Sequence, residues 1–337
     1  MNKNPICSQY ALAVIRAVMQ EAQVPAFPPE LTLEDLYAFA KAHNVEALVY
    51  YGLCQWNPDT TDPLWQHWEN RAAMLLAQGV VQLNDRDEVF SVLTNAGIPL
   101  LPVKGCWLKE LYPSMEYRQM ADLDMLVPAE KVQEAKKWML SLGYRTEDFE
   151  NSPNHAGYLK PPYTEVELHV RLLQEDGGYY DDVWNRAQRV DGYPCLYRLR
   201  AEDEYIYYLL HLQKHLEDAG TGIRSILDCA VYRDVYRNMD RIYLEKELKH
   251  LNLWELAGKI ETLADCWFQT GAVVPKELED LAESILAAGS YGTIENRSRN
   301  RLERLQKRYK NPIARGIVYW LIQICRPMEE MTQSYPV

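Results

Sequence analysis

Two acidic residues, Asp122 and Asp124, alternate with apolar residues in the segment ADLDMLV at positions 121–127. A period of two is typical of a β-strand, in which residues i and i+2 project from the same face. We therefore expect the two carboxylates to lie side by side, with Cα atoms about 6.5–7 Å apart. Paired carboxylates suit Mg²⁺, which binds oxygen ligands and keeps waters and phosphates in its shell. The triplet alone has little specificity, because it also occurs on exposed strand faces.

A second segment, TEVELHV at 164–170, has the same alternation and places Glu165, Glu167 and His169 on one polar face. If this strand lies beside the first, one of its glutamates completes a cluster of three carboxylates. Such a cluster is unfavourable without cations, so clustering would indicate a metal site. Two Mg²⁺ ions there could activate an attacking oxygen and hold a nucleotide's phosphates for in-line displacement. The alternative is an ordinary exposed strand face.

Possible phosphate contacts precede the first acidic segment. Lys104 and Gly105 occupy an expected strand-to-helix turn, where a glycine lets backbone N–H groups approach an anion at the helix N-terminus and the lysine adds a cation. A plain turn with a surface lysine is the alternative. Arg118 either neutralises phosphate charge or pairs with a carboxylate. His169 either orients Glu167 or touches a phosphate, or makes a structural hydrogen bond.

Further candidates lie in a helical stretch downstream. His215, Arg224 and Asp228 could line a cleft, although the spacing of the last two also suits an ion pair between helical neighbours. The basic segment 296–310 is either a solvated helix face or a surface that contacts phosphates or a partner.

The elements that must position these residues change along the chain. Apolar spacing predicts helices at 8–21 and 63–95, with a further helix capped by Thr32 and by Asp35 at the capping-box position. Short apolar or alternating runs then predict four strands, separated by two helices that start with Gly105 and Pro128. This order is typical of a small α/β sheet domain. The predicted strands cover 98–103, 121–127, 144–149 and 163–172, and the helices cover 105–111 and 128–142.

The last third of the chain is again helical by pattern, with segments at 204–216, 223–239, 242–251 and 253–270. We therefore expect three parts: an N-terminal helical region (1–95), an α/β core (96–200) and a C-terminal helical region (201–337).

Composition excludes several classes of protein. The chain has 337 residues and a net charge of −12, so its overall field repels nucleic acid and anionic lipid. Modification of nucleic-acid ends is a further possibility, and only the basic segment 296–310 supports it. Its seven cysteines include no CxxC pair, as expected for reduced thiols in the cytoplasm. No apolar run is long enough for a membrane span, and the apolar segment 313–324 is better interpreted as a buried helix.

Taken together, LPVKG at 101–105, YRQMADLDMLVP at 117–128 and EVELHV at 165–170 resemble the uncharacterised nucleotidyltransferase family, a branch of the DNA polymerase β-like nucleotidyltransferase superfamily. The resemblance implies a mixed sheet flanked by helices and transfer of a nucleoside monophosphate from an NTP to a hydroxyl, with release of pyrophosphate. It also implies that Asp122 and Asp124 are the paired metal ligands. Glu167 matches the third acid, which would assist deprotonation of the acceptor.

One departure from the superfamily pattern is Cys106, which follows Gly105 where a serine is usual. A thiol is a poor substitute for the serine's hydrogen bond to phosphate, which leaves that contact to Lys104.

Two hypotheses follow: a Mg²⁺-dependent nucleotidyltransferase that acts on a small molecule or a protein, or a non-catalytic nucleotide-binding or regulatory module of the same fold. The sequence does not select the nucleotide, the acceptor or the oligomeric state. Replacing both aspartates by asparagine is expected to abolish Mg²⁺-dependent nucleotide binding with little loss of stability, because exposed acids repel one another.

Overall fold

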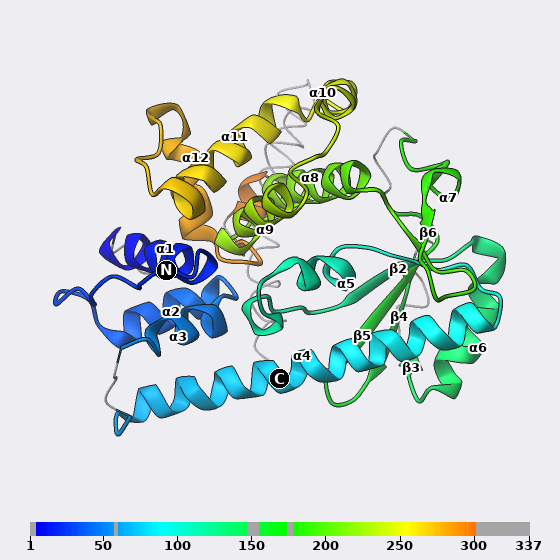
Figure 1. Cartoon of the computed structure of the whole chain (residues 1–337), viewed down its shortest axis with the longest axis horizontal. Helices are drawn as coiled ribbons and strands as arrows, with labels where there is room; N and C mark the ends of the chain where they lie inside the picture. Colours follow the sequence, from blue (N-terminus) through cyan, green and yellow to red (C-terminus); the bar gives the residue numbers. More distant parts are fainter. Residues whose placement is uncertain (1–4, 57–59, 147–154, 174–177, 295, 301–337) are drawn as a thin grey trace, which may run out of the picture.

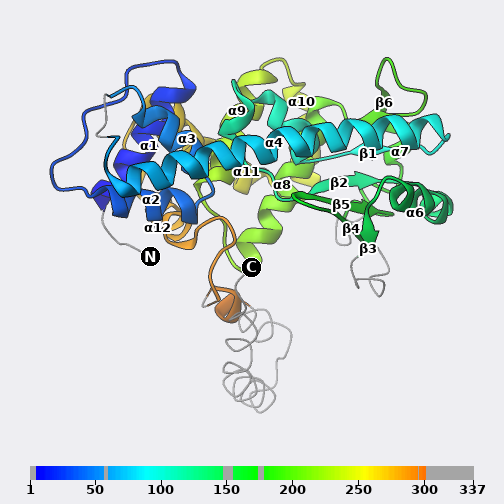
Figure 2. The same ribbon diagram turned by 90° about the horizontal axis from the view of Figure 1, so that it is seen from below.

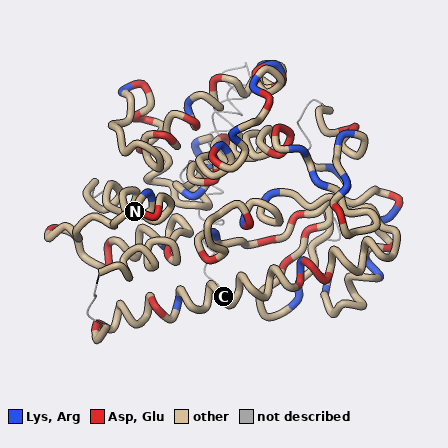
Figure 3. The backbone as a smooth tube through the Cα atoms, viewed as in Figure 1, with Lys and Arg blue, Asp and Glu red and all other residues tan. Residues whose placement is uncertain are grey.

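The computed structural model describes residues 5–56, 60–146, 155–173, 178–294 and 296–300. The apolar segment 313–324 and most of the basic segment 296–310 lie outside these residues. Helices surround one small five-stranded sheet, which makes the fold mixed α+β, as predicted (Figure 1). Lysine and arginine residues are interspersed with acidic residues along most elements (Figure 3). None of the described helices is both long and apolar enough to cross a bilayer.

Four helices form the N-terminal part: α1 (Pro5–Met19), α2 (Leu33–Ala42), α3 (Glu46–Leu53) and α4 (Pro63–Asn95). The predicted cap of α2 is confirmed, because the Thr32 hydroxyl accepts a hydrogen bond of 3.1 Å from the Asp35 backbone N–H. The predicted long helix is also confirmed, and Asp62 caps its start by accepting a hydrogen bond of 2.7 Å from the Leu64 N–H.

Helix α4 joins two hydrophobic cores. Its first half packs Trp65 and Trp68 among the other N-terminal helices, and its second half packs Phe90 and Leu93 beneath the sheet. At 33 residues it is about 50 Å long, and both views show it extending from the N-terminal helices to the sheet (Figures 1 and 2). The helix thus connects the helical part of the molecule to the sheet.

The sheet has the strand order β1-β2-β5-β4-β3, in which β2 and β5 are parallel and all other neighbours are antiparallel. The strands predicted at 98–103, 121–127 and 163–172 are present but shorter than expected. The strand predicted at 144–149 is present as β3, and residues 147–149 lie outside the described part of the chain. Strand β4 was not predicted, because its segment HAGYLK lacks alternation. The strands are β1 (Leu101–Pro102), β2 (Leu123–Leu126), β3 (Arg145–Thr146), β4 (His155–Lys160) and β5 (Thr164–His169).

Short helices and turns connect the strands. Helix α5 (Gly105–Leu108) continues into the 3₁₀ turn η1 (Lys109–Leu111), and the turn η2 (Met115–Tyr117) follows. After β2, the turn η3 (Ala129–Lys131) leads into α6 (Val132–Ser141). The predicted helices in these two places are therefore confirmed in position, each with one 3₁₀ turn.

The two faces of the sheet differ in character. Met125, Val166 and Leu168 belong to a core that includes residues of α4 and α6. Because neighbouring residues of a strand point to opposite faces, Asp124 and Glu167 project from the other face. That face is turned toward the helical layer that contains α8, as Figure 1 shows.

The remaining elements begin with α7 (Val183–Arg186) and the small β6 (Gln188–Arg189) and β7 (Tyr197–Arg198) pair. The four predicted helices are present, and the last one is divided into an α-helix and a π-helical turn, η4. The elements are α8 (Ala201–Asp218), α9 (Ile223–Val235), α10 (Arg241–His250), α11 (Trp254–Ala264), η4 (Asp265–Thr270), η5 (Lys276–Leu278) and α12 (Glu279–Ala288).

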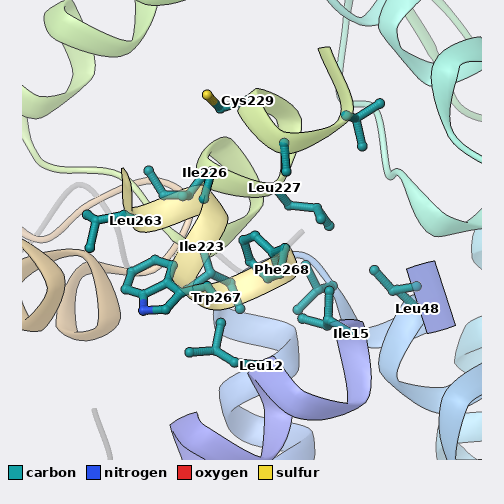
Figure 4. Packing of buried hydrophobic residues seen from close by; sticks show 14 of the residues in the cluster. Leu12, Ile15, Leu48, Ile223, Ile226, Leu227, Cys229, Leu263, Trp267 and Phe268 are labelled. Carbon is teal, nitrogen blue, oxygen red and sulfur yellow. The ribbon is translucent and has the colours of Figure 1, made fainter. Parts of the chain in front are cut away.

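The N-terminal and C-terminal helices share a single hydrophobic core. Leu12 and Ile15 of α1 pack near Ile223 of α9 and Phe268 of η4 (Figure 4). Helices at opposite ends of the chain therefore stabilise one another by burying the same apolar surface. The division of the chain at residues 95 and 200 remains a prediction.

His43, at the end of α2, joins three helices through its ring. Its Nδ1 accepts a hydrogen bond of 3.2 Å from the Ile223 N–H, and its Nε2 is 3.2 Å from the Leu286 carbonyl oxygen. Because a backbone N–H can only donate and a carbonyl can only accept, both bonds require the neutral ring with its proton on Nε2. Burial lowers the pKa of His43 to about 4.

This ring should make the fold sensitive to acid. Between pH 6.5 and pH 4 the unfolded chain binds a proton at His43 that the folded chain does not, so the free energy of unfolding falls by about 1.4 kcal/mol per pH unit. Urea unfolding measures the free energy of unfolding at pH 6.5 and at pH 5. Between these two pH values it should fall by about 2 kcal/mol more in the wild type than in His43→Gln. All other ionisable groups are the same in both proteins, so their contributions cancel. Equal losses would contradict the prediction.

Candidate functional site

Three titratable side chains meet on the polar face of β2 and β5. Asp124 and Glu167 are register partners in this parallel pair, so their side chains project side by side. His169 lies two residues beyond Glu167 on the same face, and its Nε2 is 2.8 Å from Asp124 Oδ1 and 3.2 Å from Glu167 Oε2. One ligand atom from each residue lies within 4.8 Å of the others. The arrangement therefore forms a candidate metal site.

Asp122 lies just before β2, outside this group of three. Burial and then the charge of Asp124 raise the pKa of the Asp122 carboxyl, and Lys104 opposes that rise. The carboxylate thus lies in a negative field that extends from the candidate metal site. It also lines the neighbouring cavity described below.

Lys104 pairs with an acid of the candidate metal site. Its Nζ is 2.9 Å from Asp124 Oδ2. Its backbone has φ +51° and ψ −123°, a region that costs an L-residue on the order of 1–3 kcal/mol. Burial alone would lower the pKa of Lys104, but the charge of Asp124 outweighs burial and raises it. The partner of this lysine in the structure is therefore a carboxylate, and its contact with phosphate remains a prediction.

Asp124 is only 1% exposed. Burial favours its neutral form, but the nearby Lys104 and the hydrogen bond from His169 outweigh burial and hold the pKa of Asp124 well below its usual range. The expectation of exposed acids that repel one another is therefore wrong for Asp124. Its charge is buried and compensated by two cationic groups.

The donor set fits a divalent cation. Asp124 Oδ2 lies within ion-pair distance of Lys104, but no described residue donates it a well-aligned hydrogen bond. Two carboxylates and an imidazole are ligands for hard to borderline divalent ions. Burial lowers the pKa of His169, but hydrogen bonds to Asp124 and Glu167 outweigh it and raise the pKa to about 9. A cation ligated by this ring would therefore displace a proton.

A cavity of about 240 Å³ lies beside these acids, between the sheet and the helices α8 and α9. It brings together most of the site residues predicted from the sequence, whereas Asp124, Glu167 and His169 are not among its lining residues. The predicted residues on its wall are Lys104, Gly105, Arg118, Asp122, His215, Arg224 and Asp228.

Arg118 pairs with a carboxylate in the structure, as one of the two alternatives has it, and its contact with phosphate stays a prediction. Its guanidinium donates to both carboxylate oxygens of Asp228 at 2.9 and 3.1 Å, and the Tyr112 hydroxyl donates to the same carboxylate at 2.6 Å. Asp228 therefore pairs with Arg118 of the core rather than with Arg224, its neighbour on α9. Arg224 instead donates to the Gln119 carbonyl at 3.3 Å.

Two residues that were not predicted from the sequence, Tyr207 and His211 of α8, also line this cavity. The Nε2 atoms of His211 and His215 are 2.8 Å apart. The spacing of four residues between the two histidines was the available signal, because it places them on one helix face. Cys106, by contrast, is buried against the Asp124 carbonyl and does not line the cavity.

A small mixed sheet between helices, with an acid cluster across two parallel strands, is consistent with a nucleotidyltransferase core. A family model described as "Uncharacterised nucleotidyltransferase" matches residues 29–269, and the chain belongs to this family. This match confirms the resemblance seen in the sequence. No curated protein and no solved structure matches the chain.

Proposed function

We propose that the protein transfers a nucleoside monophosphate from an NTP to an acceptor hydroxyl in a Mg²⁺-dependent reaction. The observation that carries this proposal is the register of β2 and β5, which pairs Asp124 with Glu167 next to a cavity lined by Asp122 and several cationic groups. Asp122, Asp124 and Glu167 would hold Mg²⁺, with two ions in the NTP complex. Bound Mg²⁺ would supply Lewis-acid stabilisation of charge on the phosphates.

The side chains of the cavity and those of the adjoining metal site have separate roles in this proposal. Lys104, Gly105 and Arg224 contact the phosphates, and Arg118 is held by Asp228 as part of the cavity wall. Glu167 receives the proton of the acceptor hydroxyl, and His169 orients Glu167 through their contact of 3.2 Å. The acceptor oxygen forms a bond to the α-phosphorus, the bond from that phosphorus to the bridging oxygen breaks, and pyrophosphate leaves.

A second function, that of a non-catalytic nucleotide-binding or regulatory module, is favoured by a specific observation. Cys106 replaces the superfamily serine and lies outside the cavity, while Lys104 is engaged by Asp124. Both features weaken the expected binding of the terminal phosphates without affecting the acids.

A cytoplasmic location is also part of the proposal, supported by six free cysteines among the described residues.

Calorimetry with ATP, GTP, CTP and UTP, each with Mg²⁺ or with EDTA, tests the proposal together with an assay of pyrophosphate release over a library of hydroxyl acceptors. We expect one nucleotide to bind only with Mg²⁺ and to release pyrophosphate when an acceptor is present. Binding without turnover on any acceptor would favour the regulatory module. Absence of binding by all four nucleotides would contradict both functions.

A further inference from the structure

A second cavity, of about 190 Å³, adjoins the first and shares part of its lining. Gln119, Arg224 and Tyr291 line both cavities, whereas Lys109 lines only the second, and Lys104 and Asp122 line only the first. Of the described residues that line the second cavity, none is an aspartate or a glutamate. We call it the Lys109 cavity.

Lys109 is a buried cation without a carboxylate partner among the described residues. It is only 2% exposed, and its ammonium group donates to the Arg118 carbonyl at 2.7 Å. Burial, followed by the nearby charge of Arg118, lowers the pKa of Lys109 to about 8, and the charge of Glu116 opposes this shift only in part. Burying a charge that is compensated only in part is unfavourable. An anion in the cavity would remove this penalty.

Two further donors face the same space. Gln119 Nε2 is buried and has no hydrogen-bond partner among the described residues, which is uncommon for a buried amide. Arg224 donates to the Gln119 carbonyl at 3.3 Å and forms no ion pair with a described carboxylate. A third cation on the wall, Arg71, is already compensated by Glu46 at 3.0 Å. Because Arg224 also lines the first cavity and is assigned to the nucleotide's phosphates, the donors left for an anion in the Lys109 cavity are Lys109 and Gln119.

We propose that the Lys109 cavity binds a phosphate or carboxylate group of the acceptor, so that the acceptor of nucleotidyl transfer is an anionic hydroxyl compound. This inference rests on the proposed function. The cavity is much larger than the ~30 Å³ share of one water, so an oxyanion fits. The candidate metal acids adjoin the first cavity through Lys104 and Asp122. Lys109 lines only the second cavity, so we assign an anion that it binds to the molecule that does not carry the reacting phosphate.

Binding of inorganic phosphate to the full chain, measured by calorimetry without Mg²⁺, tests the cavity independently of catalysis. We expect Lys109→Met to weaken phosphate binding by at least about tenfold, as for loss of a charged hydrogen bond. Lys137→Met, at an exposed lysine, should bind as the wild type does. Absence of phosphate binding by the wild type, or equal binding by Lys109→Met, would overturn the proposal.

Gln119→Glu provides a second variant with an opposite effect on stability. The new carboxylate would line the same cavity as the cations Lys109 and Arg224, so it should raise the unfolding temperature while it excludes phosphate. A lower unfolding temperature together with retained phosphate binding would contradict the proposed charge balance of the cavity.

A third arm distinguishes the acceptor from the nucleotide as the source of the anion. Phosphate should still bind when the protein is saturated with Mg²⁺ and a non-hydrolysable analogue of the NTP. Competition between the two would overturn the acceptor assignment, because the cavity would then hold the nucleotide's own phosphates. If no NTP binds, the proposed function fails, but the binding of phosphate without Mg²⁺ can still be measured. Failure of the proposed function and failure of the cavity proposal are therefore distinguishable.

Discussion

Asp124→Asn is expected to abolish nucleotidyl transfer and also to destabilise the fold. Loss of a buried charge that would hold the metal should lower the rate of pyrophosphate release by about 10²–10³-fold or more. The same change leaves Lys104 without its partner at 2.9 Å, and removal of one member of a buried ion pair costs about 3 kcal/mol. Pyrophosphate release and urea unfolding measure the two effects.

Asp122→Asn provides the matched comparison. Asp122 lies in the negative field of Asp124, so removing its charge should leave the free energy of unfolding unchanged or raise it by up to about 1 kcal/mol, while transfer is lost to a similar extent. The exposed Glu130, changed to glutamine, is the control for an acid elsewhere.

The two aspartate variants can contradict the site in different ways. An Asp124→Asn protein that still binds Mg²⁺ and nucleotide normally would count against the metal assignment. If Asp124→Asn is as stable as the wild type, then the contact with Lys104 does not contribute to folding.

The largest effect on stability is expected from Asp228→Ala. The carboxylate holds Arg118 through two hydrogen bonds and Tyr112 through a third, and all three residues are buried. Its removal leaves a buried guanidinium unpaired and should lower the free energy of unfolding by about 3–5 kcal/mol. Chemical denaturation measures this loss.

A combined variant tests the cause. Arg118→Met, Asp228→Leu and Tyr112→Phe replace all three polar groups by apolar ones, so most of the stability should return. Nucleotide binding measured on the same variants separates structure from recognition. If Asp228→Ala loses nucleotide binding with less than about 1 kcal/mol of destabilisation, then the carboxylate serves the ligand and the pair contributes little to the fold.

Local patterns in the sequence predicted much of the secondary structure. The capping bond from Asp35 to Thr32, the long helix that starts at Pro63 and the alternation around Asp124 and Glu167 all depend on residues a few positions apart. The side-chain period of a strand then determines which residues share a face. For this reason the sequence identified two polar strand faces that carry acids, and the motifs within them identified the family.

Contacts between residues distant in sequence were decided by the tertiary structure. The register of β2 with β5 pairs Asp124 with Glu167. Asp228 pairs with Arg118, which is 110 residues away in the sequence, and not with Arg224, which is four residues away on α9. The burial of Asp124 and the two cavities depend on which helices cover the polar face of the sheet. Strand pairing and helix docking join segments that carry no local signal of one another, so alternation alone could not distinguish a buried acid from an exposed one.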